Sequence, residues 1–116
     1  KAIETVPATK DPHRSKKIRE VLFNRLREFE ERGDCLIIAH FDQGAYVPTL
    51  NIPHISPVGG FDTKTGKVLV LDVDPEEEKH YRIGFDTFYK GLSSNCHRVF
   101  HSTGFGRGGY VFVRLP

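Results

Sequence analysis

The stretch PHISPVGGFDTKTGKVLVLDV, residues 53–73, predicts a β-hairpin on which the interpretation of the whole sequence depends. Residues 54–61 and 67–73 are two apolar runs of strand length, and the second is almost entirely Val and Leu. Asp, Thr and Gly in the connection, residues 62–66, are typical of hairpin turns. We therefore expect two neighbouring antiparallel strands in this part of the chain.

The register of this hairpin predicts which side chains share a face. If residues 62–66 form the connection, Phe61 pairs with Lys67, and the same register pairs Ser56 with Asp72. His54 is then a diagonal neighbour of Asp72, roughly 7 Å away at the backbone, on the same face. A slip of one residue would separate the two side chains.

A histidine beside an aspartate is the orienting half of a catalytic triad. A carboxylate that accepts a hydrogen bond from the imidazole fixes its tautomer and stabilises the imidazolium ion. Gly59 and Gly60 add to this interpretation, because glycines within a strand mark a bulge or a close approach of backbone or ligand. The alternative is that Asp72 caps a turn and that His54 is an ordinary surface residue.

The remaining sequence predicts an α+β fold with an antiparallel sheet of about four strands. Apolar residues at spacings of three and four predict a long amphipathic helix, which Gly33 ends. The predicted elements are an extended arm at 1–12, the helix at 15–32, strands at 35–41, 54–61, 67–73 and 110–116, a charged loop at 74–84 and a short helix at 85–94.

Composition limits the classes of protein to consider. A chain of 116 residues with 38% hydrophobic residues forms one domain, or part of one, spanning 1–116. A net charge of +2 does not favour a nucleic-acid partner, and no apolar run is long enough for a membrane span. The chain begins with Lys rather than Met, which suggests a piece of something longer. The compartment is not determined, although we favour the cytoplasm.

The sequence around this hairpin resembles the phytochelatin synthase family, a branch of the papain-like cysteine peptidases. HISPVGGFDTKTGKVLVLDV is similar to the family's segment around its catalytic His and Asp, which stand eighteen positions apart, as do His54 and Asp72. The flanking segments CLIIAHFDQG and GFGRGGYVFVRLP are also similar, so that the resemblance covers about 20–116. It implies a papain-like sheet lobe with His54 and Asp72 as catalytic residues.

The sequence departs from the family at three places. Pro53 replaces the glycine before the catalytic histidine, and Asp74 and Pro75 stand where the family has a basic residue that holds substrate. The family's nucleophilic Cys lies about a hundred residues before its His, whereas only 53 residues precede His54. The nucleophile is therefore expected upstream of this chain or on a second chain.

The two cysteines of the chain are poor candidates for the nucleophile. Cys35 begins an apolar strand rather than a helix, so we interpret it as a core residue. Cys96 lies beside His97 and near His101, which leaves open a small metal-binding domain.

The resemblance implies a cysteine peptidase or γ-glutamylcysteine transferase that acts on glutathione-like peptides through an acyl-enzyme. Ser56 and Arg107 are candidate substrate contacts, and this interpretation involves no cofactor and no metal. Two alternatives remain open: an inactive papain-like binding module and the small metal-binding domain. The expected partner is a small peptide or thiol-peptide substrate, without nucleic acid or membrane.

Overall fold

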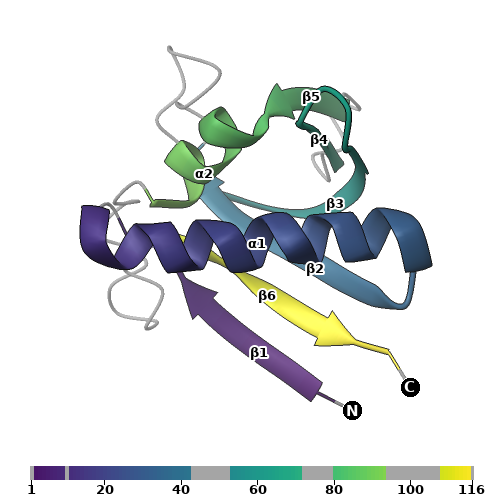
Figure 1. Ribbon diagram of the computed structural model, residues 1–116, viewed down its shortest axis with the longest axis horizontal. Helices are drawn as coiled ribbons and strands as arrows, with labels where there is room; N and C mark the ends of the chain where they lie inside the picture. Colours follow the sequence, from purple (N-terminus) through teal and green to yellow (C-terminus); the bar gives the residue numbers. More distant parts are fainter. Residues whose placement is uncertain (1, 10, 43–52, 72–79, 94–107, 116) are drawn as a thin grey trace.

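The part of the chain that the structure describes folds as a six-stranded antiparallel sheet with two helices (Figure 1). The computed structural model describes residues 2–9, 11–42, 53–71, 80–93 and 108–115. Its elements are β1 (Ala2–Pro7), α1 (Pro12–Arg32), β2 (Cys35–Asp42), β3 (Pro53–Asp62), β4 (Lys67–Leu71), β5 (His80–Gly84), α2 (Phe85–Ser93) and β6 (Gly109–Arg114). The α+β class and the antiparallel sheet predicted from the sequence are confirmed.

The strand order is β1-β6-β2-β3-β4-β5, so the predicted number of about four strands is too low. One missed strand, β1, lies in the predicted arm, where residues 2–7 pair with β6 along the whole strand. The other, β5, lies in the predicted charged loop and pairs with β4. Both are the outermost strands of the sheet. Their pairing depends on partners far away in the sequence, which local patterns do not reveal.

Helix α1 begins earlier than the sequence pattern predicts, at Pro12 instead of Ser15. Asp11 is the N-cap, and its side chain accepts a hydrogen bond from the backbone N–H of His13. Proline suits this first turn, since its missing N–H would have no partner within the helix. Gly33 ends the helix as predicted, with φ of 66°, and its N–H donates to the carbonyl of Phe29.

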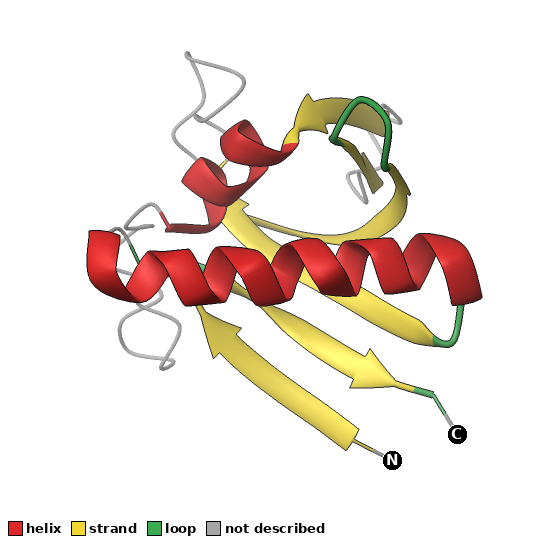
Figure 2. Ribbon diagram, in the orientation of Figure 1, coloured by secondary structure: helices red, strands yellow, loops and turns green. Residues whose placement is uncertain are grey.

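The two helices lie on the same side of the sheet and enclose one core (Figure 2). Leu22 and Leu26 of α1 and Leu92 of α2 have no exposed surface. Residues of β2 that face them, such as Ile37 and Ala39, are equally buried. Burial of this apolar surface is the main stabilising contribution to the fold.

The opposite side of the sheet, which we call the outer face, carries no charged residue at its positions within residues 3–5, 36–40, 55–57 and 111–113. Those positions are Ile3, Thr5, Val111, Val113, Leu36, Ile38, His40, Ile55 and Pro57. Three of their side chains are largely exposed: Ile3 by 62%, Ile55 by 53% and Leu36 by 45%. A sheet face that is open to solvent usually carries polar residues, so exposed apolar side chains at these positions are unusual.

Strand β3 changes neighbours along its length. Its first half pairs with β2 as far as the pair Ile38–Pro57. A β-bulge then lies between Val58 and Gly60, and the pairs described beyond it are with β4 alone. Bulges bend a strand and increase its twist, and here the bend turns the β3–β4 hairpin away from β2. Of the two interpretations that the sequence left open for the glycines, a bulge or a close approach of backbone or ligand, the structure shows the bulge.

Candidate functional site at the β3–β4 hairpin

The hairpin connection is one residue shorter than predicted, and the register near the turn differs accordingly. Phe61 pairs with Val68, not with Lys67, so that predicted pair is wrong. The reason is Asp62, which belongs to β3 and pairs with Lys67, leaving only residues 63–66 in the turn. Its carboxylate accepts a hydrogen bond from the Lys64 N–H at 2.9 Å, and such backbone donors lower the pKa of this carboxyl group.

The bulge at Gly59 compensates for the shorter turn. On the N-terminal side of the bulge, Val58 pairs with Val70. This pair belongs to the register that the sequence predicts for Ser56 and Asp72. The strand next to β3 is therefore the predicted one, in the predicted register at Val58. Asp72 itself follows the last residue of β4, Leu71, and lies outside the described residues.

The predicted catalytic pair is only partly described. The backbone of His54 belongs to β3 and pairs with Phe41 of β2, while its side chain is outside the described set. Asp72 and Arg107 are outside it entirely. The contact between imidazole and carboxylate, and the role of Arg107, stay predictions.

Ser56 lies on β3 opposite Ala39, and its side chain has no exposed surface. Its Oγ has no hydrogen-bond partner among the described residues. A hydroxyl at this depth is closed to a ligand in solution. The position of Ser56 therefore gives no support to the predicted substrate contact.

Cys35 is a core residue, as the sequence predicts, with 1% of its surface exposed. Phe41, the partner of His54, is six positions further along β2, which corresponds to about 20 Å. Burial, together with the nearby carboxylates of Glu28 and Asp34, raises the pKa of the Cys35 thiol. Cys35 is therefore too far from His54 to act with it, and its raised pKa disfavours the thiolate that a nucleophile needs.

Cys35 also belongs to a possible metal-ligand cluster with Glu28 and Asp34, whose ligand atoms all lie within 4.8 Å of one another. Glu28, however, already forms a salt bridge of 3.0 Å with Arg114. A metal ion would have to displace this guanidinium group and deprotonate a thiol whose pKa is raised. The cluster is therefore a poor metal site. The other sequence candidates, Cys96, His97 and His101, lie outside the described residues.

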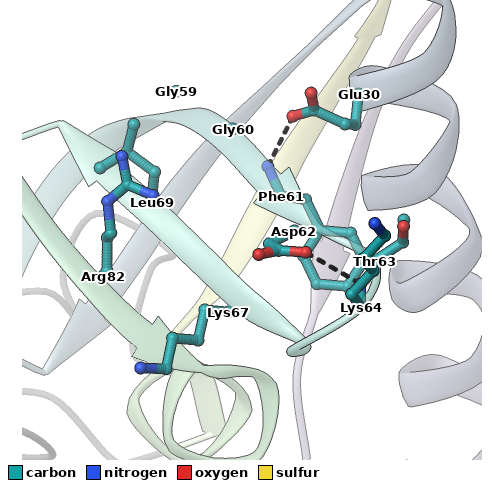
Figure 3. A pocket seen from close by; sticks show the side chains of 10 residues that line it. All are labelled: Glu30, Gly59, Gly60, Phe61, Asp62, Thr63, Lys64, Lys67, Leu69 and Arg82. Atoms are coloured by element: carbon teal, nitrogen blue, oxygen red, sulfur yellow. Dashed lines mark hydrogen bonds between the residues drawn. The ribbon is translucent and has the colours of Figure 1, made fainter.

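The hairpin borders a surface cavity of about 560 Å³ that sequence analysis did not predict (Figure 3). Residues 59–64 line it together with Glu30 of α1, Lys67 and Leu69 of β4 and Arg82 of β5. The sequence places Lys67 and Leu69 on one face of the predicted strand, but no local pattern brings Glu30 or Arg82 beside them, and β5, which supplies Arg82, was interpreted as a loop.

Comparisons with known proteins add no assignment: no family model matches the chain, and no curated protein matches it. Among the described residues, no helix is both long and apolar enough to cross a membrane.

Proposed function

We propose that this chain is the part of a phytochelatin-synthase-like cysteine peptidase or γ-glutamylcysteine transferase that bears the catalytic His and Asp. His54 and Asp72 belong to its catalytic centre, and glutathione-like peptides are its substrates. The nucleophilic cysteine comes from polypeptide beyond this chain.

The observation that supports this proposal best is the pairing of Val58 with Val70. It shows that β3 and β4 are adjacent and antiparallel, and that the bulge gives β3 the register on which the prediction for His54 and Asp72 depends. If the register of the pair Phe61–Val68 continued without a bulge, every residue of the first half of β3 would be displaced by one position relative to β4.

The reaction follows from the roles of the three groups. A thiolate attacks the carbonyl carbon of the substrate, and the protonated His54 gives its proton to the leaving amine. Asp72 orients the imidazole and stabilises its charged form. Water, or the amine of a second peptide, then attacks the acyl-enzyme. His54 accepts the proton of this attacking group, and the thiolate is released.

Two features of the described chain support a nucleophile from outside it. Cys35 is buried and about 20 Å along the sheet from the pairing partner of His54. The outer face is apolar, and exposed apolar patches of this kind mark contacts with other polypeptide. Both fit a chain that is completed by a further part.

The test uses the product of the complete reading frame. We expect it to release glycine from glutathione, measured by amino-acid analysis, and to contain one cysteine upstream of this chain that iodoacetamide alkylates selectively. His54→Ala should lower turnover at least about 100-fold, since general acid–base catalysis contributes about 10²–10⁴-fold. Asp72→Asn should also lower it strongly.

The matched control is His13→Ala, because His13 is an exposed residue in the first turn of α1. All three variants should keep the far-ultraviolet circular dichroism of the parent. Turnover that survives His54→Ala would rule out the proposal. Glutathione binding without turnover in the parent would instead indicate an inactive binding module.

A further inference from the structure

We propose that the cavity beside the β3–β4 hairpin binds a small organic anion that carries at least two negative charges. Its cationic groups are Lys64, Lys67 and Arg82, which come from the hairpin turn, β4 and β5 respectively. This proposal is independent of the proposed function.

The sheet register brings two of these cations together. Arg82 pairs with Leu69, and Leu69 pairs with Gly60, so these three residues form one row across three strands. Lys67 lies two residues from Leu69 and is a diagonal neighbour of Arg82, roughly 7 Å away at the backbone. Figure 3 shows the Arg82 side chain alongside Leu69.

The cavity also contains two carboxylates, but both already accept hydrogen bonds from the backbone. Glu30 accepts from the Phe61 N–H at 2.9 Å, and Asp62 accepts from the Lys64 N–H at 2.9 Å (Figure 3). Neither Lys67 nor Arg82 forms an ion pair with any residue that the structure describes, although Asp62 lies directly opposite Lys67. The cations are therefore available to a ligand, and the three of them outnumber the two carboxylates, which keep their charge but are held by backbone donors.

The shape of the cavity favours an organic ligand over a bare inorganic ion. A volume of about 560 Å³ is within the usual range of small-molecule sites. Gly60 lines the cavity without a side chain, and a Cβ there would lie in ordinary van der Waals contact, 3.4 Å from the Glu30 carboxylate and 3.8 Å from Leu69. Leu69 provides an apolar wall, and the guanidinium group of Arg82 suits bidentate contact with a carboxylate or a phosphate.

The cavity is separate from the proposed catalytic centre. Gly60 is six positions from His54 along β3, which corresponds to at most about 20 Å because the bulge bends the strand between them. A glutathione-sized peptide bound at His54 would not extend to Arg82. Ligands of the two sites can therefore be tested independently.

The experiment is a titration of the 116-residue chain with pyrophosphate and, separately, with citrate, followed by amide chemical shifts in low-salt buffer. We expect saturable shifts of the Gly59, Gly60 and Lys64 amides. The probe that saturates at lower concentration distinguishes a phosphate-bearing from a carboxylate-bearing ligand. Lys67→Ala combined with Arg82→Ala should weaken binding at least about tenfold.

The matched control is Lys16→Ala combined with Lys17→Ala, which removes the same charge from exposed positions of α1. It should leave the affinity within about twofold. Equal weakening by both double variants would show non-specific attraction and overturn the proposal, as would the absence of saturable shifts for both probes. Gly60→Val gives a further check, because it places apolar atoms in the cavity wall beside Leu69 without changing charge and should reduce the shifts at Lys64.

Discussion

The carboxylate of Glu30 accepts a hydrogen bond of 2.9 Å from the backbone N–H of Phe61, where β3 has left the side of β2. A strand that loses a neighbour exposes backbone donors that need another acceptor. Here α1 supplies the acceptor. The same contact ties the end of the helix to the bent hairpin and forms one wall of the hairpin cavity.

Replacing Glu30 by Ala should therefore destabilise the fold by about 1 kcal/mol, the usual net contribution of a hydrogen bond. This corresponds to roughly 4–8 °C in Tm for a domain of about this size, measured by thermal denaturation. Glu30→Gln keeps an acceptor and should lose less. The control is Glu31→Ala at an exposed helix position, and an equal loss in Glu31→Ala would contradict the assignment.

Adjacent residues of β2 should respond very differently to the same change, because they face opposite sides of the sheet. Ile37 is 1% exposed on the inner side, and Leu36 is 45% exposed on the outer face. Ile37→Ala should cost about 2–5 kcal/mol, as expected for truncation in a core. Leu36→Ala should change the unfolding free energy by less than about 1 kcal/mol in urea titrations. Similar costs at both positions would show that the outer face is covered.

The sequence predicted the parts of the fold whose signals are local. The apolar spacing of α1, the cap at Gly33 and the turn residues of the β3–β4 hairpin all act within a few positions along the chain. Strands β1 and β5 were missed because each is a short edge strand of mixed composition. Their pairing depends on β6 and β4, which local patterns do not encode.

In the candidate site, too, the features with local sequence signals could be predicted, and those that depend on distant residues could not. The neighbouring strands of the hairpin could be predicted from residue types alone, and a bulge was one of the two interpretations that its glycines allowed. The turn was predicted one residue too long, since the sequence does not show whether Asp62 pairs with Lys67 or belongs to the turn. The hairpin cavity could not be predicted, because Glu30 and Arg82 join it from elements that only the tertiary fold brings together.

Cys35 should react slowly with thiol reagents in the folded chain. Its side chain is buried, and burial raises the pKa of the thiol, so little thiolate forms at neutral pH. We expect iodoacetamide to leave Cys35 largely unmodified in buffer and to modify it rapidly in urea, as measured by mass spectrometry of its peptide. Rapid labelling in buffer would mean that the start of β2 is accessible and would reopen its candidacy as a nucleophile.

The ion pair between Glu4 and Arg25 should make stability depend on acid pH. The hydrogen bond from Arg25 lowers the pKa of the Glu4 carboxyl group below its usual 4.5. A lowered pKa stabilises the folded state above about pH 4.5, and this contribution is lost as the pH falls through the folded pKa. Glu4 is largely exposed, so the effect should stay below about 1 kcal/mol.

Urea titrations at pH 7 and pH 2 test this prediction. Glu4→Gln should be less stable than the parent at pH 7 and equally stable at pH 2. Glu20→Gln, at an exposed position of α1, serves as the control for removal of a carboxylate. If Glu4→Gln leaves the unfolding free energy at pH 7 unchanged, the ion pair does not stabilise the fold.

The bulge at Gly59 should depend on the absence of a side chain there. A Cβ at Gly59 would lie 2.6 Å from the Leu71 side chain, so that Leu71 would have to move. Gly59→Ala should therefore cost about 1–3 kcal/mol, the usual cost of overpacking. Leu71→Ala should remove most of the added cost when combined with it, because truncation relieves the clash. This coupling is measurable by a double-mutant cycle in urea.

Gly60→Ala is the matched control, because a Cβ there has its nearest contact at 3.4 Å, with the end of the flexible Glu30 side chain. Nuclear Overhauser effects between the backbones of Val58 and Val70 report whether the register survives each change. If Gly59→Ala moves the bulge, the half of β3 that includes His54 shifts against β4 by one residue. Under the proposed function, the product of the complete reading frame should then lose glycine release together with this contact. If glycine release is retained although the Val58–Val70 contact is lost, the proposed reaction does not depend on the register of the hairpin.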